Sequence, residues 1–167
     1  RLHMDPCWTN DPSKKAENEA DISAFNMARY RLYLQKLYIP LIKDAIAHGL
    51  YVIVRPPGVC PQDISVGDKY NRYLKSVWKA FAADEYIQQN SGLISIELAN
   101  EPVRVHLSDG KDSEMALRDF FQPVLDEIRE QGFKGIIWVP GAGYQSQYQN
   151  YDKYPITDSE DNFSYAV

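Results

Sequence analysis

Apolar residues recur at helical spacing in three stretches of the chain. We predict a helix over residues 69–83, because one of its faces collects Tyr70, Leu74, Val77, Trp78 and Phe81. The same spacing predicts a helix over 114–131 and another over 22–37. Pro40 either interrupts this last helix or opens a second segment that runs to His48.

Short, continuous apolar runs alternate with these helices and have the length of buried strands: 50–54, 93–99 and 136–139. Residues 1–4 and 162–167 have the character of two further strands, and 143–156 is a polar loop rich in tyrosine. Apolar strands separated by helices predict a parallel sheet with right-handed crossovers. We therefore expect a single domain over 1–167, an open parallel sheet of about five strands with helices outside.

The polar and aromatic residues suited to chemistry follow the ends of these strands: Arg1, His3, Trp8, Arg55, Asn100, Glu101, Tyr144 and Gln145. Parallel strands bring their carboxyl ends to one rim, which is where (β/α)-barrel enzymes carry their active sites. A complete eight-stranded (TIM) barrel needs about 250 residues. We therefore interpret the 167 residues as a partial (β/α)8 barrel.

The run 93–99 ends abruptly in Asn100-Glu101-Pro102. Pro102 cannot donate to a strand ladder, so the strand stops there and Glu101 reaches the mouth of the sheet. A carboxylate in this place is either a catalytic group or the cap of a loop. Glu97 shares the strand face of Glu101 and lies deeper. A buried carboxylate must be paired, so we expect Glu97 to bond Arg1 or Arg55.

The segment Ile96-Glu97-Leu98-Ala99-Asn100-Glu101-Pro102 resembles the fourth strand of glycoside hydrolase family 5, the cellulase-type (β/α)8 barrels of clan A. Arg1-Leu2 is similar to the end of that family's second strand, 137–141 to its fifth strand and 163–167 to its sixth. The resemblance implies that Glu101 is the general acid/base and that Asn100 donates to the sugar 2-hydroxyl. The motif is shared across the clan, so it identifies the clan more firmly than the family.

The chain departs from the family pattern in two places. Many relatives end the third strand in a histidine that lines the site, whereas this chain has Arg55. Arg55 either contacts substrate or holds an acidic neighbour. The family's nucleophile ends the seventh strand, which this chain does not reach, and retaining hydrolysis needs two carboxyls about 5–5.5 Å apart.

Two functions remain open on these residues. The first is a retaining, endo-acting hydrolase of β-linked glucan, most simply β-1,4-glucan, and the second is a non-catalytic carbohydrate-binding remnant. Tyr144 and Gln145 match the faces and hydroxyl edges of sugars, although loop tyrosines also pack on barrel rims. We expect Trp8 to form a stacking platform and His3 to line the cleft. A polymeric substrate implies an extracellular or periplasmic location.

Charge and motifs argue against other classes of protein. The net charge of −5 disfavours binding to nucleic acid or to an acidic membrane surface. No stretch has the length and apolar character of a membrane span. No strand is followed by GxGxxG or GxxxxGK[ST], which disfavours a nucleotide-binding domain. With no paired cysteine motif, we expect neither a metal nor another cofactor.

Two further expectations concern the chain as a whole. Cys7 follows the second strand of the barrel and Cys60 the third, so their sulfurs should approach, within reach of a bond of about 2.05 Å. The alternative is two unlinked thiols. A partial barrel exposes strand edges and an apolar inner face, and we expect the remaining barrel strands or a second copy to cover them.

Overall fold

The computed structural model describes residues 1–166, and its centre is a four-stranded parallel sheet in the order β1-β3-β5-β6. Its strands are β1 (Val52–Val54), β3 (Ile94–Glu97), β5 (Ile137–Pro140) and β6 (Phe163–Ala166). Leu2 lies beside β1, where its N–H donates to the Ile53 carbonyl at 2.7 Å and forms a single parallel bridge with Val54. The N-terminal segment thus lies where the expected fifth strand should be, although only Leu2 pairs.

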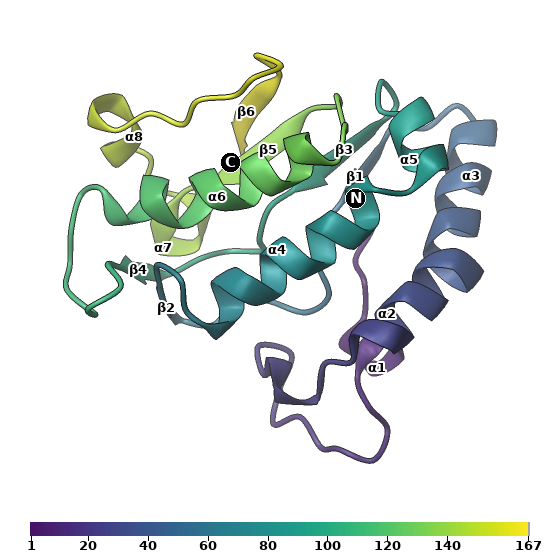
Figure 1. Ribbon diagram of the computed structural model, residues 1–167, viewed down its shortest axis with the longest axis horizontal. Helices are drawn as coiled ribbons and strands as arrows, with labels where there is room; N and C mark the ends of the chain where they lie inside the picture. Colours follow the sequence, from purple (N-terminus) through teal and green to yellow (C-terminus); the bar gives the residue numbers. More distant parts are fainter. Residues whose placement is uncertain (167) are drawn as a thin grey trace.

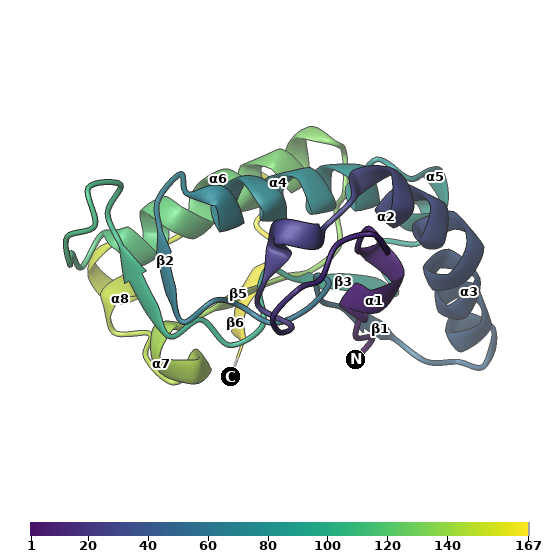
Figure 2. The same ribbon diagram turned by 90° about the horizontal axis from the view of Figure 1, so that it is seen from below.

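Two long amphipathic helices cover one face of this sheet (Figures 1 and 2). They are α4 (Lys69–Ala82) and α6 (Ala116–Glu130), within one or two residues of the predicted bounds. The apolar face predicted for α4 is buried, and the Trp78 indole N–H donates to the Leu98 carbonyl at 3.0 Å. This bond fixes α4 against the end of β3, from which Asn100 and Glu101 follow.

The first helical stretch is divided where the sequence predicted one helix. A 3-10 turn, η1 (Ile22–Ala24), precedes α2 (Met27–Tyr33), which Asn26 caps by accepting from the Arg29 N–H at 3.0 Å. A π-helical turn, η2 (Leu34–Tyr38), then leads into α3 (Ile39–Ala47). Pro40 lies in the first turn of α3, directly after the π turn, so its missing N–H falls where the hydrogen-bond pattern of the helix changes. Of the two readings of Pro40, the opening of a second segment is therefore confirmed.

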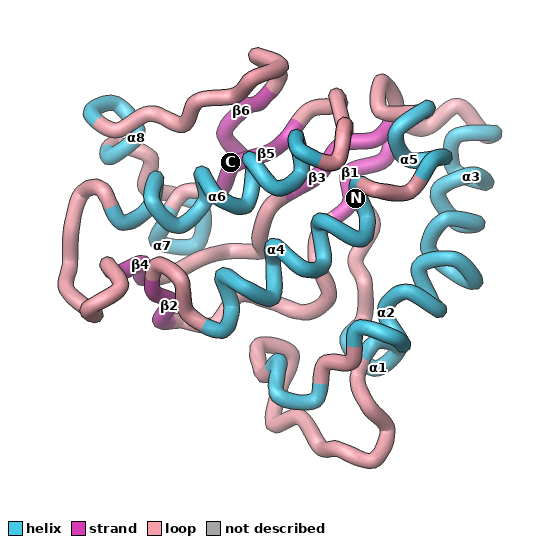
Figure 3. The backbone as a smooth tube through the Cα atoms, viewed as in Figure 1, coloured by secondary structure: helices cyan, strands magenta, loops and turns pink. Residues whose placement is uncertain are grey.

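Several short elements lie outside the apolar pattern. β2 (Asp63–Ser65) and β4 (Arg104–His106) form a separate two-stranded parallel sheet. The short helices are α1 (Pro6–Thr9), α5 (Glu85–Gln89), α7 (Ala142–Gln145) and α8 (Asn150–Lys153). Two of these helices lie in the predicted polar loop 143–156, and Figure 3 shows the long loop that follows α8 and leads into β6.

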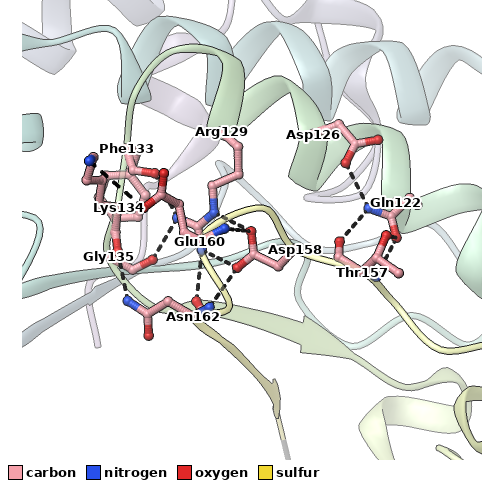
Figure 4. Close-up of polar contacts among 10 residues, drawn as sticks. All are labelled: Gln122, Asp126, Arg129, Phe133, Lys134, Gly135, Thr157, Asp158, Glu160 and Asn162. Atoms are coloured by element: carbon pink, nitrogen blue, oxygen red, sulfur yellow. Dashed lines mark hydrogen bonds and ion pairs between the residues drawn. The ribbon is translucent and has the colours of Figure 1, made fainter.

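A buried arginine ties this last loop to the end of α6 (Figure 4). Arg129 donates from Nε and Nη2 to the two carboxylate oxygens of Asp158, each at 2.7 Å. Its remaining N–H groups donate to the carbonyls of Phe133, Gly135 and Asn162 at 2.8–2.9 Å. The side chains of Arg129 and Asp158 are 5% and 0% exposed. This contact sets where β6 begins beside β5.

The other face of the sheet is left partly open. Ile53, Ser95 and Trp138 are half-buried there and border a cavity of about 500 Å³. The Trp138 indole donates to the Ser95 hydroxyl at 3.0 Å. Sequential parallel strands with helices on one side and an open inner face form part of a (β/α) barrel, as predicted. No helix in the described residues is both long enough and apolar enough to cross a membrane.

Candidate active site

A buried carboxylate organises the carboxyl ends of the strands. Glu97, the last residue of β3, is 4% exposed. Arg1 binds it with both Nε, at 2.7 Å, and Nη2, and Gln145 donates to the same carboxylate at 3.0 Å. The expectation that Glu97 is buried and paired is confirmed, with Arg1 as the partner. The ion pair joins the N-terminal segment to β3, and Gln145 adds the segment that follows β5.

Asn100 lies directly above this pair and is 3% exposed. Its amide oxygen accepts from Arg1 Nη2 at 2.9 Å and also from Arg55 Nη1. Its backbone carbonyl accepts from the Cys60 N–H at 3.0 Å. Both the main chain and the side chain of Asn100 are therefore held in place beside Glu101.

Arg55, which follows β1, bridges Asn100 and His3. Its Nε donates to His3 Nδ1 at 2.8 Å, and its Nη2 contacts the same atom. Burial, followed by the adjacent Arg55 charge, lowers the pKa of His3 below its usual value. Burial and the nearby Arg1 charge also lower the pKa of Arg55. Of the two alternatives for Arg55, an acidic partner is not found, because the hydrogen-bond partners of its side chain within residues 1–166 are an amide and an imidazole. Contact with substrate stays a prediction.

Glu101 is exposed just past β3, and its backbone is left-handed with φ of 54°. The turn after β5 has the same rare conformation at Gly143, Tyr144 and Gln145, with φ of 57°, 58° and 62°. The Tyr144 N–H donates to the Pro102 carbonyl at 2.9 Å, which binds this turn to the chain beside Glu101. Left-handed non-glycine residues cost free energy and cluster at functional sites.

Glu101 opens onto a groove of about 600 Å³. Asn100 and Tyr144 form this groove together with Cys60 and Pro61, and the loop before η1 lines it with Glu17, Asn18 and Asp21. Tyr144 is 61% exposed, so its ring is accessible to a ligand. The groove combines one exposed carboxylate, one fixed amide and one aromatic face.

The structure does not bring all the predicted site residues to this groove. Arg1 and Gln145 line a smaller inner cavity of about 220 Å³ with Glu97. Trp8 lies on α1, 44% exposed, and packs against Tyr33 with ring centroids 5.2 Å apart. It is not among the residues that line the groove beside Glu101, and its role as a stacking platform stays a prediction. The groove residues of the loop before η1 were missed because no apolar period or motif marks them.

The two cysteines are free, with Cys7 exposed and Cys60 buried. No disulfide joins them, so of the two alternatives the unlinked thiols are confirmed. The Cys7 N–H is held by the Asp5 carboxylate at 2.8 Å in the first turn of α1. Cys60 instead enters the core, where burial raises the pKa of its thiol to about 12. Within residues 1–166, no group of three or more histidine, cysteine or acidic side chains is arranged to hold a metal ion.

Comparisons with known proteins agree with this architecture. The family model for cellulase (glycosyl hydrolase family 5) matches residues 5–167. The catalytic domain of Thermobifida fusca endoglucanase Cel5A (E5) is 23% identical with a TM-score of 0.59, and the match covers 87% of this chain and 45% of that one. XacCel5A in complex with cellopentaose is 18% identical with a TM-score of 0.59, covering 86% and 45%.

A GH5-4 broad-specificity endoglucanase from an uncultured bovine rumen ciliate is 14% identical with a TM-score of 0.58. That match covers 91% of this chain and 41% of the ciliate chain. No curated protein matches the chain. The chain spans less than half the length of these solved structures, and the likeness in fold agrees with part of a (β/α) barrel.

Proposed function

The chain belongs to glycosyl hydrolase family 5, the cellulase family, and from this we propose that it carries the acid/base half of a retaining endo-β-1,4-glucanase site. Glu101 is the general acid/base. The observation that carries the proposal is the position of Glu101, exposed just past β3 beside the fixed Asn100 amide and open to a groove of about 600 Å³. A carboxylate at the end of a barrel strand is where this fold carries its chemistry.

In the proposed reaction, Glu101 first donates a proton to the glycosidic oxygen as the bond to the anomeric carbon breaks. It then takes a proton from the water that releases the sugar from the enzyme. The resemblance assigns the nucleophilic carboxylate to the seventh strand of a complete barrel. Asn100 donates to the sugar 2-hydroxyl, a hydrogen bond that strengthens in the transition state.

The substrate we propose is a β-1,4-glucan, on which such an enzyme acts outside the cell or in the periplasm. A relative of the same fold binds cellopentaose. On this chain, the exposed ring of Tyr144 offers a face for the C–H surface of a sugar. Arg1 and Gln145 lie deeper in the sheet than Glu101. They bind the Glu97 carboxylate and so support the strand end that carries Asn100 and Glu101.

The acid/base role predicts a dependence on the leaving group. In an active assembly that contains this chain, Glu101→Gln should slow cellopentaose hydrolysis by about 10²–10⁴-fold. The first step on 2,4-dinitrophenyl β-cellobioside should survive, because that leaving group departs without a proton. Glu85→Gln makes the same chemical change on the exposed first turn of α5 and should leave both rates intact.

Two results would contradict the proposal. Equal losses on both substrates would show that Glu101 is not a proton donor to the leaving group. Binding of cellopentaose without turnover, in an assembly that also contains the second carboxylate, would favour the non-catalytic carbohydrate-binding alternative.

A further inference from the structure

Arg55 faces two hydrogen-bond acceptors that belong to different segments of the chain. Its Nη1 contacts the Asn100 amide oxygen, and its Nε contacts His3 Nδ1 at 2.8 Å. A guanidinium group has only donors and does not lose its proton in proteins. Each atom that faces Arg55 must therefore be an acceptor, which constrains the chemistry of both partners.

For Asn100, this constraint fixes the orientation of the amide. Arg1 donates to the same oxygen at 2.9 Å, so a flipped amide would direct its NH₂ group at two guanidinium groups. The amide nitrogen makes no hydrogen bond to any of the described residues, and Asn100 borders the groove that Glu101 enters. The two N–H donors of Asn100 are therefore left for a ligand in the groove.

For His3, the constraint fixes the tautomer. A neutral imidazole has one donor and one acceptor, so an Nδ1 that accepts from Arg55 leaves the proton on Nε2. This nitrogen lies 3.8 Å from the Glu19 carboxylate. Of the charged groups around His3, Arg55 and Arg1 disfavour its protonation, and Glu19 and Asp5 favour it. Burial is the largest influence and, together with the two arginines, it lowers the pKa of His3 below its usual value.

We propose that Arg55 is a positioning residue that fixes the Asn100 amide and the His3 tautomer, so that both present N–H donors away from Arg55. The Asn100 donors border the groove and suit a hydroxyl oxygen, as on a sugar, whereas the His3 donor lies on the side of Glu19. All three guanidinium nitrogens of Arg55 make these contacts: Nε and Nη2 contact His3, and Nη1 contacts Asn100. A lysine keeps the charge but cannot reproduce this planar fork. The choice of a sugar as the ligand rests on the function proposed above. The orientation of the Asn100 and His3 side chains does not depend on that function.

The tautomer can be read directly in the uniformly ¹⁵N-labelled chain from long-range ¹H–¹⁵N correlations of the imidazole rings. His3→Gln assigns the His3 signals. We expect His3 to show the pattern of an Nε2-protonated ring, with a pKa below the ordinary value of about 6.5. An Nδ1-protonated ring in the unaltered chain would overturn the proposal without any variant.

Two variants of Arg55 test whether this residue causes the single tautomer and the lowered pKa of His3. Arg55→Met should raise the pKa of His3 and mix its tautomers, and Arg55→Lys should keep part of the pKa effect but lose the single tautomer. Arg104→Met removes an exposed guanidinium on β4, whose partner is Asp63 at 2.5 Å, and should leave His3 unchanged. An unchanged His3 in both Arg55 variants would refute the proposal.

Kinetics separate this proposal from the proposed function. In an active assembly, Arg55→Met and Asn100→Ala should each slow hydrolysis of a glucoside at least 10-fold, and the double variant should lose little more. Neither should slow hydrolysis of the matching 2-deoxyglucoside, which lacks the hydroxyl that Asn100 binds. Additive losses would contradict action of Arg55 through Asn100. Changed His3 spectra with unchanged kinetics would count against the sugar-binding role alone.

Discussion

Replacing Arg129 by methionine removes the side chain that joins α6 to the loop before β6. Methionine keeps much of the apolar length of arginine but leaves the Asp158 carboxylate, 0% exposed, without its counter-charge. It also removes the donors to the carbonyls of Phe133, Gly135 and Asn162. Breaking one side of a buried ion pair costs about 3–5 kcal/mol. A typical domain has about 5–15 kcal/mol of stability in total, so the loss is a large fraction.

Urea unfolding followed by circular dichroism measures this loss. With a slope of about 2 kcal/mol per molar urea, we expect the midpoint to fall by about 1.5–2.5 M. The matched control is Lys153→Met, because the Lys153–Glu114 pair joins the end of α8 to the segment just before α6 but is 62% and 55% exposed. Exposed pairs contribute about 0–1 kcal/mol. A loss in Arg129→Met no larger than in Lys153→Met would show that the buried pair contributes no more than the exposed one.

Three further outcomes follow from the structure. Ellman's reagent should titrate one thiol, Cys7, in the native chain and a second, Cys60, only after denaturation, and two fast native thiols would contradict the burial of Cys60. Burial raises the pKa of Asp158, but hydrogen bonds from Arg129 and from backbone N–H groups outweigh it, and the net pKa lies below its usual value. The stability that the Asp158 carboxylate adds to the folded chain is therefore complete above about pH 3.9, the pKa of this group in the unfolded chain. That contribution disappears as the pH falls through its lower pKa in the folded chain. Asp158→Asn should remove that part of the pH dependence of unfolding, and an unchanged profile would contradict it. The open strand edges predict that the chain alone associates at micromolar concentration, which sedimentation velocity tests, and a stable monomer of 19.2 kDa would contradict it.

The parts of the fold that the sequence predicted are those whose signal is local. The long helices α4 and α6 were predicted because their buried faces repeat at helical spacing over fourteen and fifteen residues. The sheet was predicted because β1, β3 and β5 are apolar runs of strand length between those helices. The small sheet of β2 and β4 was missed, since each strand has only three residues and an exposed ion pair joins them.

The distinction between local signals and long-range contacts also explains which parts of the site were predicted. The pairing of Glu97 was predictable, because a buried carboxylate needs a partner and only a few cations follow the neighbouring strand ends. The partners of Arg55 were not, because which acceptors a guanidinium meets depends on the three-dimensional approach of separate loops. The two cysteines are unlinked for a related reason. The neighbouring positions of the two segments were predicted correctly, but the direction of each thiol depends on its own turn.

Rescue by azide tests directly whether Glu101 is the acid/base of a retaining glycosidase. Glu101→Ala in an active assembly should form the glycosyl-enzyme from 2,4-dinitrophenyl β-cellobioside but release it slowly, because no base remains to activate water. Azide needs no base, so it should restore turnover and yield β-cellobiosyl azide, with retained configuration. No rescue and no azide product from a folded Glu101→Ala protein would contradict this role.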